Sequence, residues 1–273
     1  MLVPKEIFCW IESCWGSATF LYENAIWNDL TEQAFREKTS GLLAKQDQPF
    51  CMRLVGQSGA GKTSQLLPAV KVALQSNRIS YISFAVRDFV KFHPDLEAIV
   101  KRYGESLLRE KTNAFALVLL TNVLLRCVSE KMPILLEMTL LSPAYEACIH
   151  AALVGNGYRC DYQCLAVPKT VSDDWIQKRF LETKRVVSKN SSSFFYDTLE
   201  PTFQALQGIA LKNRVFIWDR VHEQPLISDF QTPNIYDKIK AVRALEGPFL
   251  SLEDGIAAKT KFLCDFYKKY GLG

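Results

Sequence analysis

Short apolar runs alternate along the chain with longer stretches whose apolar residues recur at helical spacing. Five apolar runs predict buried strands, at residues 50–55, 78–86, 133–137, 158–167 and 214–219. The stretches around them predict helices, at residues 30–45, 64–74, 94–109, 113–131, 144–154 and 172–187. Asn28 or Asp29 is the expected N-terminal cap of the first helix, and Ser172 that of the last. Strands that alternate with helices form a parallel sheet covered on both faces, so the pattern predicts an α/β fold.

A glycine-rich loop lies between the first predicted strand and the helix after it. Residues 56–63 read GQSGAGKT and fit the phosphate-binding pattern G-x-x-x-x-G-K-[ST] at every required position. The glycines let successive N–H groups point at phosphate oxygens, Lys62 adds positive charge, and Thr63 offers a hydroxyl ligand for Mg²⁺. A coincidental glycine turn is the alternative. We therefore predict that a nucleoside triphosphate binds Gly56, Gln57, Ser58, Gly59, Ala60, Gly61, Lys62, Thr63 and Ser64.

Composition narrows the class of protein. The 273 residues suit one large α/β domain, or one domain with helical additions. The formal net charge is a mild +4, and the basic residues are mostly spread along the chain, which argues against a dedicated nucleic-acid groove. The longest apolar run, 114–125, falls short of the ~18–20 residues of a membrane helix and predicts a buried helix instead. The first residues lack a secretory signal, which predicts a soluble, cytoplasmic protein. Most of the eight cysteines lie in apolar runs without metal-site spacing, which predicts buried thiols.

Several charged residues follow the predicted strands. Ligands of a parallel sheet bind at the carboxyl ends of its strands, so Asp88, Glu137 and Arg220 are expected at one edge together with the glycine-rich loop. Glu137 ends an apolar strand, where a carboxylate is costly to bury without a partner, and is therefore a candidate site residue. Asp88 could instead cap the turn before His93, which itself is expected to be a hydrogen-bonding turn residue. A surface salt bridge is the alternative role of Arg220.

The order of these pieces resembles the zeta toxin family of P-loop kinases over residues 28–225. The resemblance rests on the loop with its trailing Ser64, on RDFVKFHP at 87–94, on LEMT at 136–139, on AVPK at 166–169 and on Arg179. It implies a three-layer P-loop NTPase/kinase fold with a mostly parallel sheet. The corresponding domain is placed at 29–225, between an aromatic-rich helical appendage, 1–28, and a C-terminal helical extension, 226–273. Core packing is the expected role of 1–28, with self-inhibition as the alternative.

The resemblance implies a kinase that uses Mg²⁺ with ATP or GTP and phosphorylates a sugar hydroxyl of UDP-N-acetylglucosamine or a related nucleotide-sugar. Members of the family are often toxins held inactive by a small antitoxin protein, which is therefore a further expected partner. Phosphoryl transfer needs a phosphate cradle, a metal ion, cations over the γ-phosphate and a base near the acceptor. The resemblance assigns catalysis to Lys62, Asp88 and Arg179, the metal to Thr63, a nucleotide contact to Arg220, and acceptor contacts to Asp88, Glu137 and Thr139.

The chain departs from the family pattern at three positions. The family's catalytic aspartate aligns with Arg87, an arginine aligns with Leu141, and a second lid arginine falls near Ser192. Two alternatives therefore stand beside the nucleotide-sugar kinase: a P-loop kinase with a different nucleotide acceptor, and a catalytically disabled nucleotide-binding interaction protein. Local capping is the alternative role of Thr139, and a solvated helix face that of Arg179.

Overall fold

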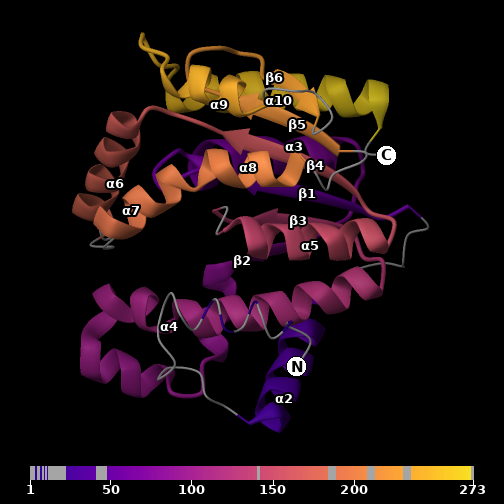
Figure 1. Ribbon diagram of the computed structural model, residues 1–273, viewed down its shortest axis with the longest axis vertical. Coiled ribbons are helices and arrows are strands. Elements are labelled where there is room, and N and C mark those ends of the chain that lie inside the picture. Colours follow the sequence, from indigo (N-terminus) through magenta and orange to yellow (C-terminus); the bar gives the residue numbers. More distant parts are fainter. Residues whose placement is uncertain are drawn as a thin grey trace.

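The computed structural model describes Pro4, Ile7, Cys9, Ile11 and residues 23–40, 48–139, 142–183, 189–207, 213–229 and 235–271. In this part of the chain, six strands form one sheet in the order β2-β3-β1-β4-β5-β6 (Figure 1). The first five strands are parallel and β6 runs antiparallel at the edge. The bounds are β1 (Phe50–Val55), β2 (Ile82–Ala85), β3 (Ile134–Glu137), β4 (Arg159–Leu165), β5 (Asn213–Trp218) and β6 (Leu226–Asp229).

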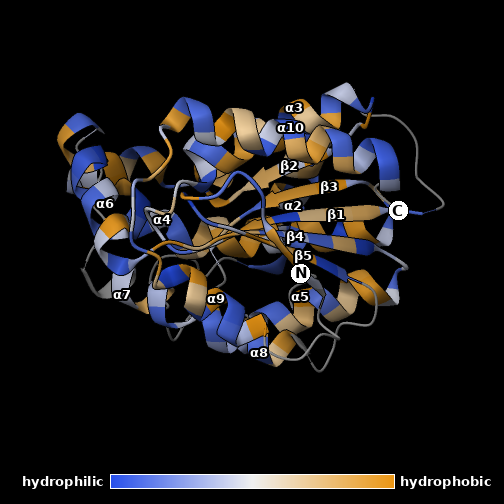
Figure 2. Cartoon of the chain, turned by 90° about the horizontal axis from the view of Figure 1, so that it is seen from above, coloured by the Kyte–Doolittle hydropathy of each residue, from blue (hydrophilic) through white to orange (hydrophobic). Residues whose placement is uncertain are grey.

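Helices cover both faces of the sheet. Figure 2 shows α3 and α10 on one side of the strands and α5, α8 and α9 on the other, which confirms the predicted α/β architecture. The helices are α2 (Asn24–Thr39), α3 (Leu67–Ser76), α4 (Leu96–Ser129), α5 (Pro143–Gly155), α6 (Lys169–Thr183), α7 (Lys189–Asp197), α8 (Leu199–Gln207), α9 (Ile235–Arg243) and α10 (Leu252–Tyr270).

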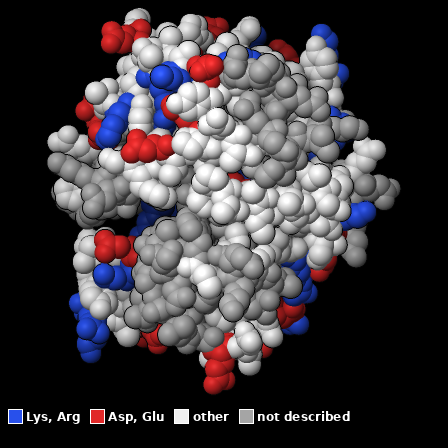
Figure 3. All heavy atoms as spheres, viewed as in Figure 1, with Lys and Arg blue, Asp and Glu red and all other residues white. Residues whose placement is uncertain are grey.

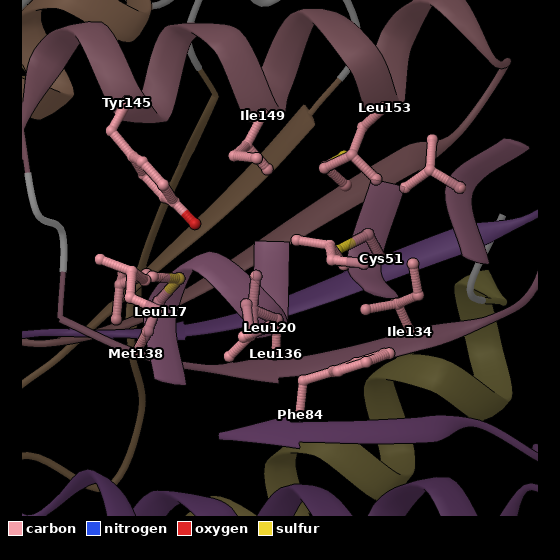
Figure 4. Close-up of a cluster of buried hydrophobic side chains, with 14 of the residues drawn as sticks. Cys51, Phe84, Leu117, Leu120, Ile134, Leu136, Met138, Tyr145, Ile149 and Leu153 are labelled. Atoms are coloured by element: carbon pink, nitrogen blue, oxygen red, sulfur yellow. The ribbon is translucent and has the colours of Figure 1, made fainter. Parts of the chain in front are cut away.

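Two apolar clusters, one on each face, follow from the alternation of side chains along the strands. Met52 and Leu54 of β1 pack with α3 and α10, whereas Cys51 of the same strand packs toward α4 and α5. Figure 4 shows Tyr145 and Ile149 of α5 facing the cluster that contains Cys51. Every residue of β1 is buried, as is typical of a central parallel strand. The prediction of buried thiols holds for Cys51, Cys127, Cys160 and Cys164, whereas Cys148 and Cys264 are half-buried and Cys9 is exposed.

The helix α4 differs from the two helices predicted at 94–109 and 113–131. It runs from Leu96 to Ser129 and is interrupted at Gly104, whose φ of 73° lies in the left-handed region that glycine tolerates. The sequence pattern therefore placed the break several residues too late. By length and composition α4 could cross a membrane, but 78% of its most apolar window is buried inside the protein. It is the core helix that the run 114–125 predicted.

Several predicted boundaries are wrong. The leading helix begins at Asn24 rather than after Asn28 or Asp29, so both of those residues lie inside α2, and neither caps it. Ser172 lies inside α6, which begins at Lys169, directly after Pro168. The strand predicted at 78–86 is shorter, and the segment 226–273, predicted as a helical extension, contains β6 before α9 and α10. Most of the predicted appendage 1–28 lies outside the described residues.

A buried polar network lies under the sheet. The Arg53 guanidinium of β1 pairs with the Glu146 carboxylate of α5 at 2.5 Å, and both side chains are fully buried. Arg53 also donates to the Tyr162 hydroxyl at 3.3 Å, and His150 Nδ1 lies 2.9 Å from the same hydroxyl. Asn213 Oδ1 accepts from the backbone N–H of residue 160, so its Nδ2 donates to His150 Nε2 at 3.1 Å. Because Nε2 of His150 accepts this hydrogen bond, the His150 imidazole must be neutral and must carry its proton on Nδ1.

We expect this histidine to make the fold acid-sensitive. Burial, with Arg53 acting in the same direction, lowers the pKa of His150 from 6.5 to about 4. Between those values the unfolded chain binds a proton that the folded chain does not, so the free energy of unfolding falls as the pH falls from 6.5 toward 4. The loss is up to about 3 kcal/mol. Urea unfolding of the native protein and of His150→Gln across this pH range measures it. An equally steep pH dependence in both proteins would contradict the assignment.

Candidate phosphate-binding and transfer site

The glycine-rich loop follows β1 at the point where the sheet changes direction. From β1 the chain goes to β2 and β3 on one side and then to β4 on the other, and ligands of parallel sheets bind at such switch points. Gly56, Gly59 and Gly61 have φ values of 143°, 77° and 103°. A Cβ atom would lie 2.3 Å from the Leu165 carbonyl oxygen at Gly56, and 2.3 Å from the Ser172 carbonyl oxygen at Gly59. Both positions therefore require glycine.

Side chains of the loop and of α6 hold this backbone in place. The buried Gln57 side chain donates from Nε2 to the Val167 carbonyl at 2.5 Å, and the Ser172 hydroxyl donates to the Ser58 carbonyl. Gln57 thus anchors the loop to the end of β4, and Ser172 anchors it to the first turn of α6. Ser172, which was predicted only as a helix cap, is a residue whose part in the loop the sequence did not reveal.

Lys62 begins a single π-helical turn, η2 (Lys62–Leu66), that leads into α3. Its ammonium donates to the carbonyl oxygens of Gly56 at 2.6 Å and Gln57 at 2.9 Å. Burial lowers the pKa of Lys62 to about 8; Glu137 opposes this shift and Arg179 adds to it. These two carbonyl contacts hold the Lys62 ammonium over its own loop.

Glu137 lies beside Thr63. This agrees with the prediction that residues at the carboxyl ends of the parallel strands meet at one edge of the sheet, and we call that expectation the strand-end rule. The Thr63 hydroxyl donates to one carboxylate oxygen, and Arg87 Nη2 lies 2.8 Å from the other. The side chain of Glu137 is only 7% exposed, so these two partners compensate for its burial. A hydroxyl and a carboxylate are oxygen ligands of the kind that Mg²⁺ prefers.

Asp88 has partners other than Thr63 and Glu137. Its carboxylate accepts from Lys38 Nζ of α2 at 2.7 Å and from the Ala85 backbone N–H at 3.2 Å, which caps the 3₁₀ turn η3 (Val86–Phe92). The capping alternative for Asp88 is therefore present in the structure, together with an ion pair that the sequence did not suggest. His93 Nδ1 accepts from the Asp95 N–H at 3.1 Å, which confirms the predicted turn hydrogen bond.

Two arginines lie on the other side of the loop. Arg179 of α6 is half-buried, burial lowers the pKa of its guanidinium, and its Nε has no hydrogen-bond partner among the described residues. Arg220 follows β5 and is only 8% exposed. Its guanidinium lies 4.8 Å from the centre of the Trp175 ring, and it lines a narrow slit beside Gly61 and Ser64. No carboxylate of the described residues pairs with Arg220, so its predicted surface salt bridge is not found there.

The remaining predicted positions are less informative. Thr139 is half-buried, two residues after the end of β3, and Leu141 lies outside the described residues. Ser192, near the position of the family's second lid arginine, is 6% exposed and its hydroxyl lies 3.2 Å from Asp173 Oδ1.

Figure 3 shows a hollow with basic atoms at its floor, in the region where Figure 1 places the space between α6 and α4. Phosphates are the anions that such a hollow can hold.

Comparisons with known proteins agree with this geometry. A family model described as zeta toxin matches residues 33–229. The fold is similar to a chain from the PezAT chromosomal toxin–antitoxin system of Streptococcus pneumoniae, with a TM-score of 0.67, 19% identity, and coverage of 91% of this chain and 98% of that chain. It is also similar to a chain of the AvrRxo1-ORF1:ORF2 complex, with a TM-score of 0.54, 12% identity and coverage of 94% and 93%.

A chain of the AvrRxo1-ORF1:ORF2 complex with ATP is similar as well, with a TM-score of 0.51, 14% identity and coverage of 90% of this chain and 84% of that chain. No curated protein matches the sequence significantly. At these identities the similar structures show a shared fold and not a shared function.

Proposed function

The chain belongs to the zeta toxin family, and on that basis we propose that it is a kinase for a nucleotide-sugar. It transfers the γ-phosphoryl group of ATP or GTP to a sugar hydroxyl of UDP-N-acetylglucosamine or a related compound. The observation that carries the proposal is the joint placement of the glycine loop, the Thr63–Glu137 contact and the half-buried Arg179. Phosphoryl transfer depends mainly on positioning and charge stabilisation, and these residues supply both.

The loop and its two oxygen ligands form the nucleotide end of the proposed site. The backbone N–H groups of the loop would cradle the phosphates, and the Lys62 ammonium would exchange its carbonyl partners for phosphate oxygens. Thr63 and Glu137 would hold Mg²⁺, because a hydroxyl and a carboxylate already meet there. When bound, the ion neutralises phosphate charge during the transfer. The ATP in the similar AvrRxo1-ORF1:ORF2 structure supports this part of the proposal.

Arg179 and Arg220 flank the loop from α6 and β5. An arginine that is partly desolvated and has an unpartnered Nε is suited to an anionic ligand, so Arg179 is proposed to stabilise charge on the transferred phosphoryl group. Arg220 is fixed between Trp175 and Phe249, with its guanidinium 4.8 Å and 5.8 Å from the two ring centres. We assign Arg220 to the nucleotide because it lies beside Gly61 and Ser64.

The acceptor end of the site favours a second candidate function. Arg87 stands where the family's catalytic aspartate aligns, and it pairs with Glu137 at 2.8 Å. Asp88 is engaged by Lys38 and by the Ala85 N–H. These contacts favour an acceptor other than UDP-N-acetylglucosamine, such as another nucleotide. A nucleotide-binding interaction protein without transfer activity is the further alternative.

A small antitoxin protein is the proposed partner. The similar chains come from a toxin–antitoxin system and from two-component ORF1:ORF2 complexes, which supports a protein that occupies or restrains this site. We propose a cytoplasmic location, where the nucleotide and the acceptor are both available.

The proposed base is Asp88, which we expect to accept the proton of the acceptor hydroxyl. Replacing Asp88 by Asn should lower the rate of transfer by about 10²-fold or more, the usual contribution of general base catalysis. The amide oxygen can still accept from the Ala85 N–H, so the η3 turn should remain capped. Steady-state rates measured alongside melting temperatures test this expectation.

The matched control for Asp88→Asn is Lys38→Met. This variant removes the same ion pair but keeps the Asp88 carboxylate, so the rate should stay within about tenfold of the native rate, since an ion pair near a surface contributes little. If Lys38→Met loses as much activity as Asp88→Asn, the carboxylate acts through the ion pair. If Asp88→Asn keeps the native rate, Asp88 is not the base.

Mass spectrometry of the reaction products tests the proposed function itself. The full chain is incubated with Mg·ATP or Mg·GTP and with UDP-N-acetylglucosamine, other UDP-sugars or a panel of nucleotides. One added phosphate group on a UDP-sugar supports the nucleotide-sugar kinase, and one on a different nucleotide supports the second candidate. Binding of Mg·ATP that raises the melting temperature without any phosphorylated product would favour the interaction protein.

A further inference from the structure

A cavity separate from the phosphate loop lies between α2, α3, β2 and η3. Its volume is about 510 Å³, which lies in the range of sites for small molecules. The cavity is open to the surface, and polar and charged side chains form most of its lining. The lining residues are Glu37, Lys38, Leu67, Lys71, Ser83, Ala85, Arg87, Asp88 and Lys91.

The lining has an excess of positive charge. Four cationic side chains line it together with two carboxylates, and the carboxylate of Glu137, outside the lining, pairs with one more cation, which leaves one positive charge over. Lys38 pairs with Asp88 at 2.7 Å and Lys91 pairs with Glu37, so two of the cations are already neutralised within the cavity. The other two cations are Arg87, whose guanidinium pairs with Glu137 outside the lining and lies 4.0 Å from Asp88, and Lys71, which carries the excess.

These two cations differ in how they are held. Lys71 projects from the second turn of α3 and has no acidic partner among the described residues. Arg87 reaches out of the cavity to Glu137, whose other oxygen accepts from Thr63. Arg87 therefore forms a wall between the cavity and the proposed phosphate-transfer site. A ligand bound to Arg87 from the cavity side would lie next to that site.

We propose that this cavity binds the phosphate groups of a small molecule. A phosphate carries close to two negative charges and several strong acceptor oxygens, which match a planar guanidinium and a flexible ammonium in the same lining. The walls lack the extended apolar surface that a nucleobase or lipid chain would need, because Leu67 and Ala85 are the apolar members. Given the proposed function, the first candidate is the phosphate portion of the acceptor, and a free phosphate-bearing effector is the other source.

Calorimetric titration with the phosphate loop already filled tests this inference. The full chain is saturated with the magnesium complex of a non-hydrolysable ATP analogue and titrated with UDP, with inorganic pyrophosphate and with neutral N-acetylglucosamine. We expect UDP or pyrophosphate to bind at one further site, and N-acetylglucosamine not to bind. In Lys71→Ala the dissociation constant of the bound anion should rise about tenfold, as expected for the loss of one charge-assisted contact.

Lys261→Ala is the matched control, because Lys261 is an exposed lysine of α10, outside the cavity. The Lys261→Ala variant should bind the anion with the same affinity as the native protein. Binding of UDP alone would identify an acceptor phosphate, and equal binding of pyrophosphate would identify a free phosphate ligand. The inference is overturned if no further site is found once the loop is filled, or if Lys71→Ala binds the anion as tightly as Lys261→Ala does.

Failure of this inference and failure of the proposed function give different results. The titration requires no phosphoryl transfer, so a Lys71-dependent anion site can be measured in a protein that proves inactive as a kinase. Conversely, a phosphorylated UDP-sugar without a Lys71-dependent site would support the kinase and refute the cavity. Where transfer is observed and the bound anion is the acceptor, Lys71→Ala should raise the KM for the acceptor and leave kcat unchanged, because Lys71 has no contact with Thr63 or Glu137.

Discussion

Replacing Lys62 by Ala is expected to abolish phosphoryl transfer, with a loss of at least about 10³-fold in kcat/KM. The ammonium is the one cation that the loop itself places over its backbone, 2.6 Å from the Gly56 carbonyl and 2.9 Å from that of Gln57. Without it, the negative charge that accumulates on the γ-phosphate has no compensation from within the loop. Product formation measured by mass spectrometry, together with the affinity for Mg·ATP, gives both parts of the loss.

The same variant should not unfold the protein. Burial lowers the pKa of Lys62 to about 8, which means that the folded protein without nucleotide bears a cost for keeping this ammonium charged. Removing the ammonium removes that cost, so the melting temperature of Lys62→Ala should equal or exceed the native value. Lys261→Ala, on the exposed side of α10, should keep native activity. A Lys62→Ala protein with transfer within tenfold of the native rate would show that the loop does not carry catalysis.

The part of this site that could be predicted is the part encoded in contiguous residues. The glycine positions, Lys62 and Thr63 follow from one short pattern between an apolar strand and a helix, and the structure places them as expected. Glu137 could also be located, because parallel strands end at a common edge and a carboxylate after four apolar residues is costly to bury without a partner. Local patterns and sheet geometry were sufficient for these positions.

The partners of the charged residues could not be predicted. The pairs Arg87–Glu137 and Lys38–Asp88 each join residues about fifty positions apart, and they depend on how η3 and α2 pack against the sheet. The strand-end rule brought Asp88 to the correct edge, but a single residue decides whether a side chain in η3 faces the loop or faces α2. The register of this one 3₁₀ turn, which the sequence motif does not reveal, decides which partner each charged side chain of η3 contacts.

The buried network around Arg53 was likewise invisible in the sequence. A lone arginine within the apolar strand 50–55 gives no sign of its partner, because Glu146 lies on a helix more than ninety residues later. The helix pattern of 144–154 predicted α5 correctly, yet its face could be assigned only after the sheet had placed Arg53 beneath it. Arg53 lies on β1, which directly precedes the phosphate loop, so the stability of this network affects the position of the loop.

Replacing Glu146 by Ala is expected to lower the free energy of unfolding by about 3–5 kcal/mol, the usual effect of leaving one member of a buried ion pair uncompensated. Both side chains of the pair are 0% exposed and their charged atoms lie 2.5 Å apart, so neither water nor salt can replace the lost carboxylate. Urea unfolding measures the change. The matched control is Glu110→Ala, which removes an exposed partner of Lys111 and should change the free energy by less than about 1 kcal/mol.

The double variant Arg53→Met/Glu146→Leu separates charge from packing. Apolar side chains of similar volume need no compensation, so the double variant should recover most of the stability lost in Glu146→Ala. A double variant as unstable as Glu146→Ala would mean that the network contributes shape rather than charge balance. Arg53 Nη2 also lies 3.6 Å from the Met138 sulfur, directly after Glu137. If the double variant is stable but slow in transfer, the pair has a second role, which is to hold the end of β3 where Glu137 meets Thr63.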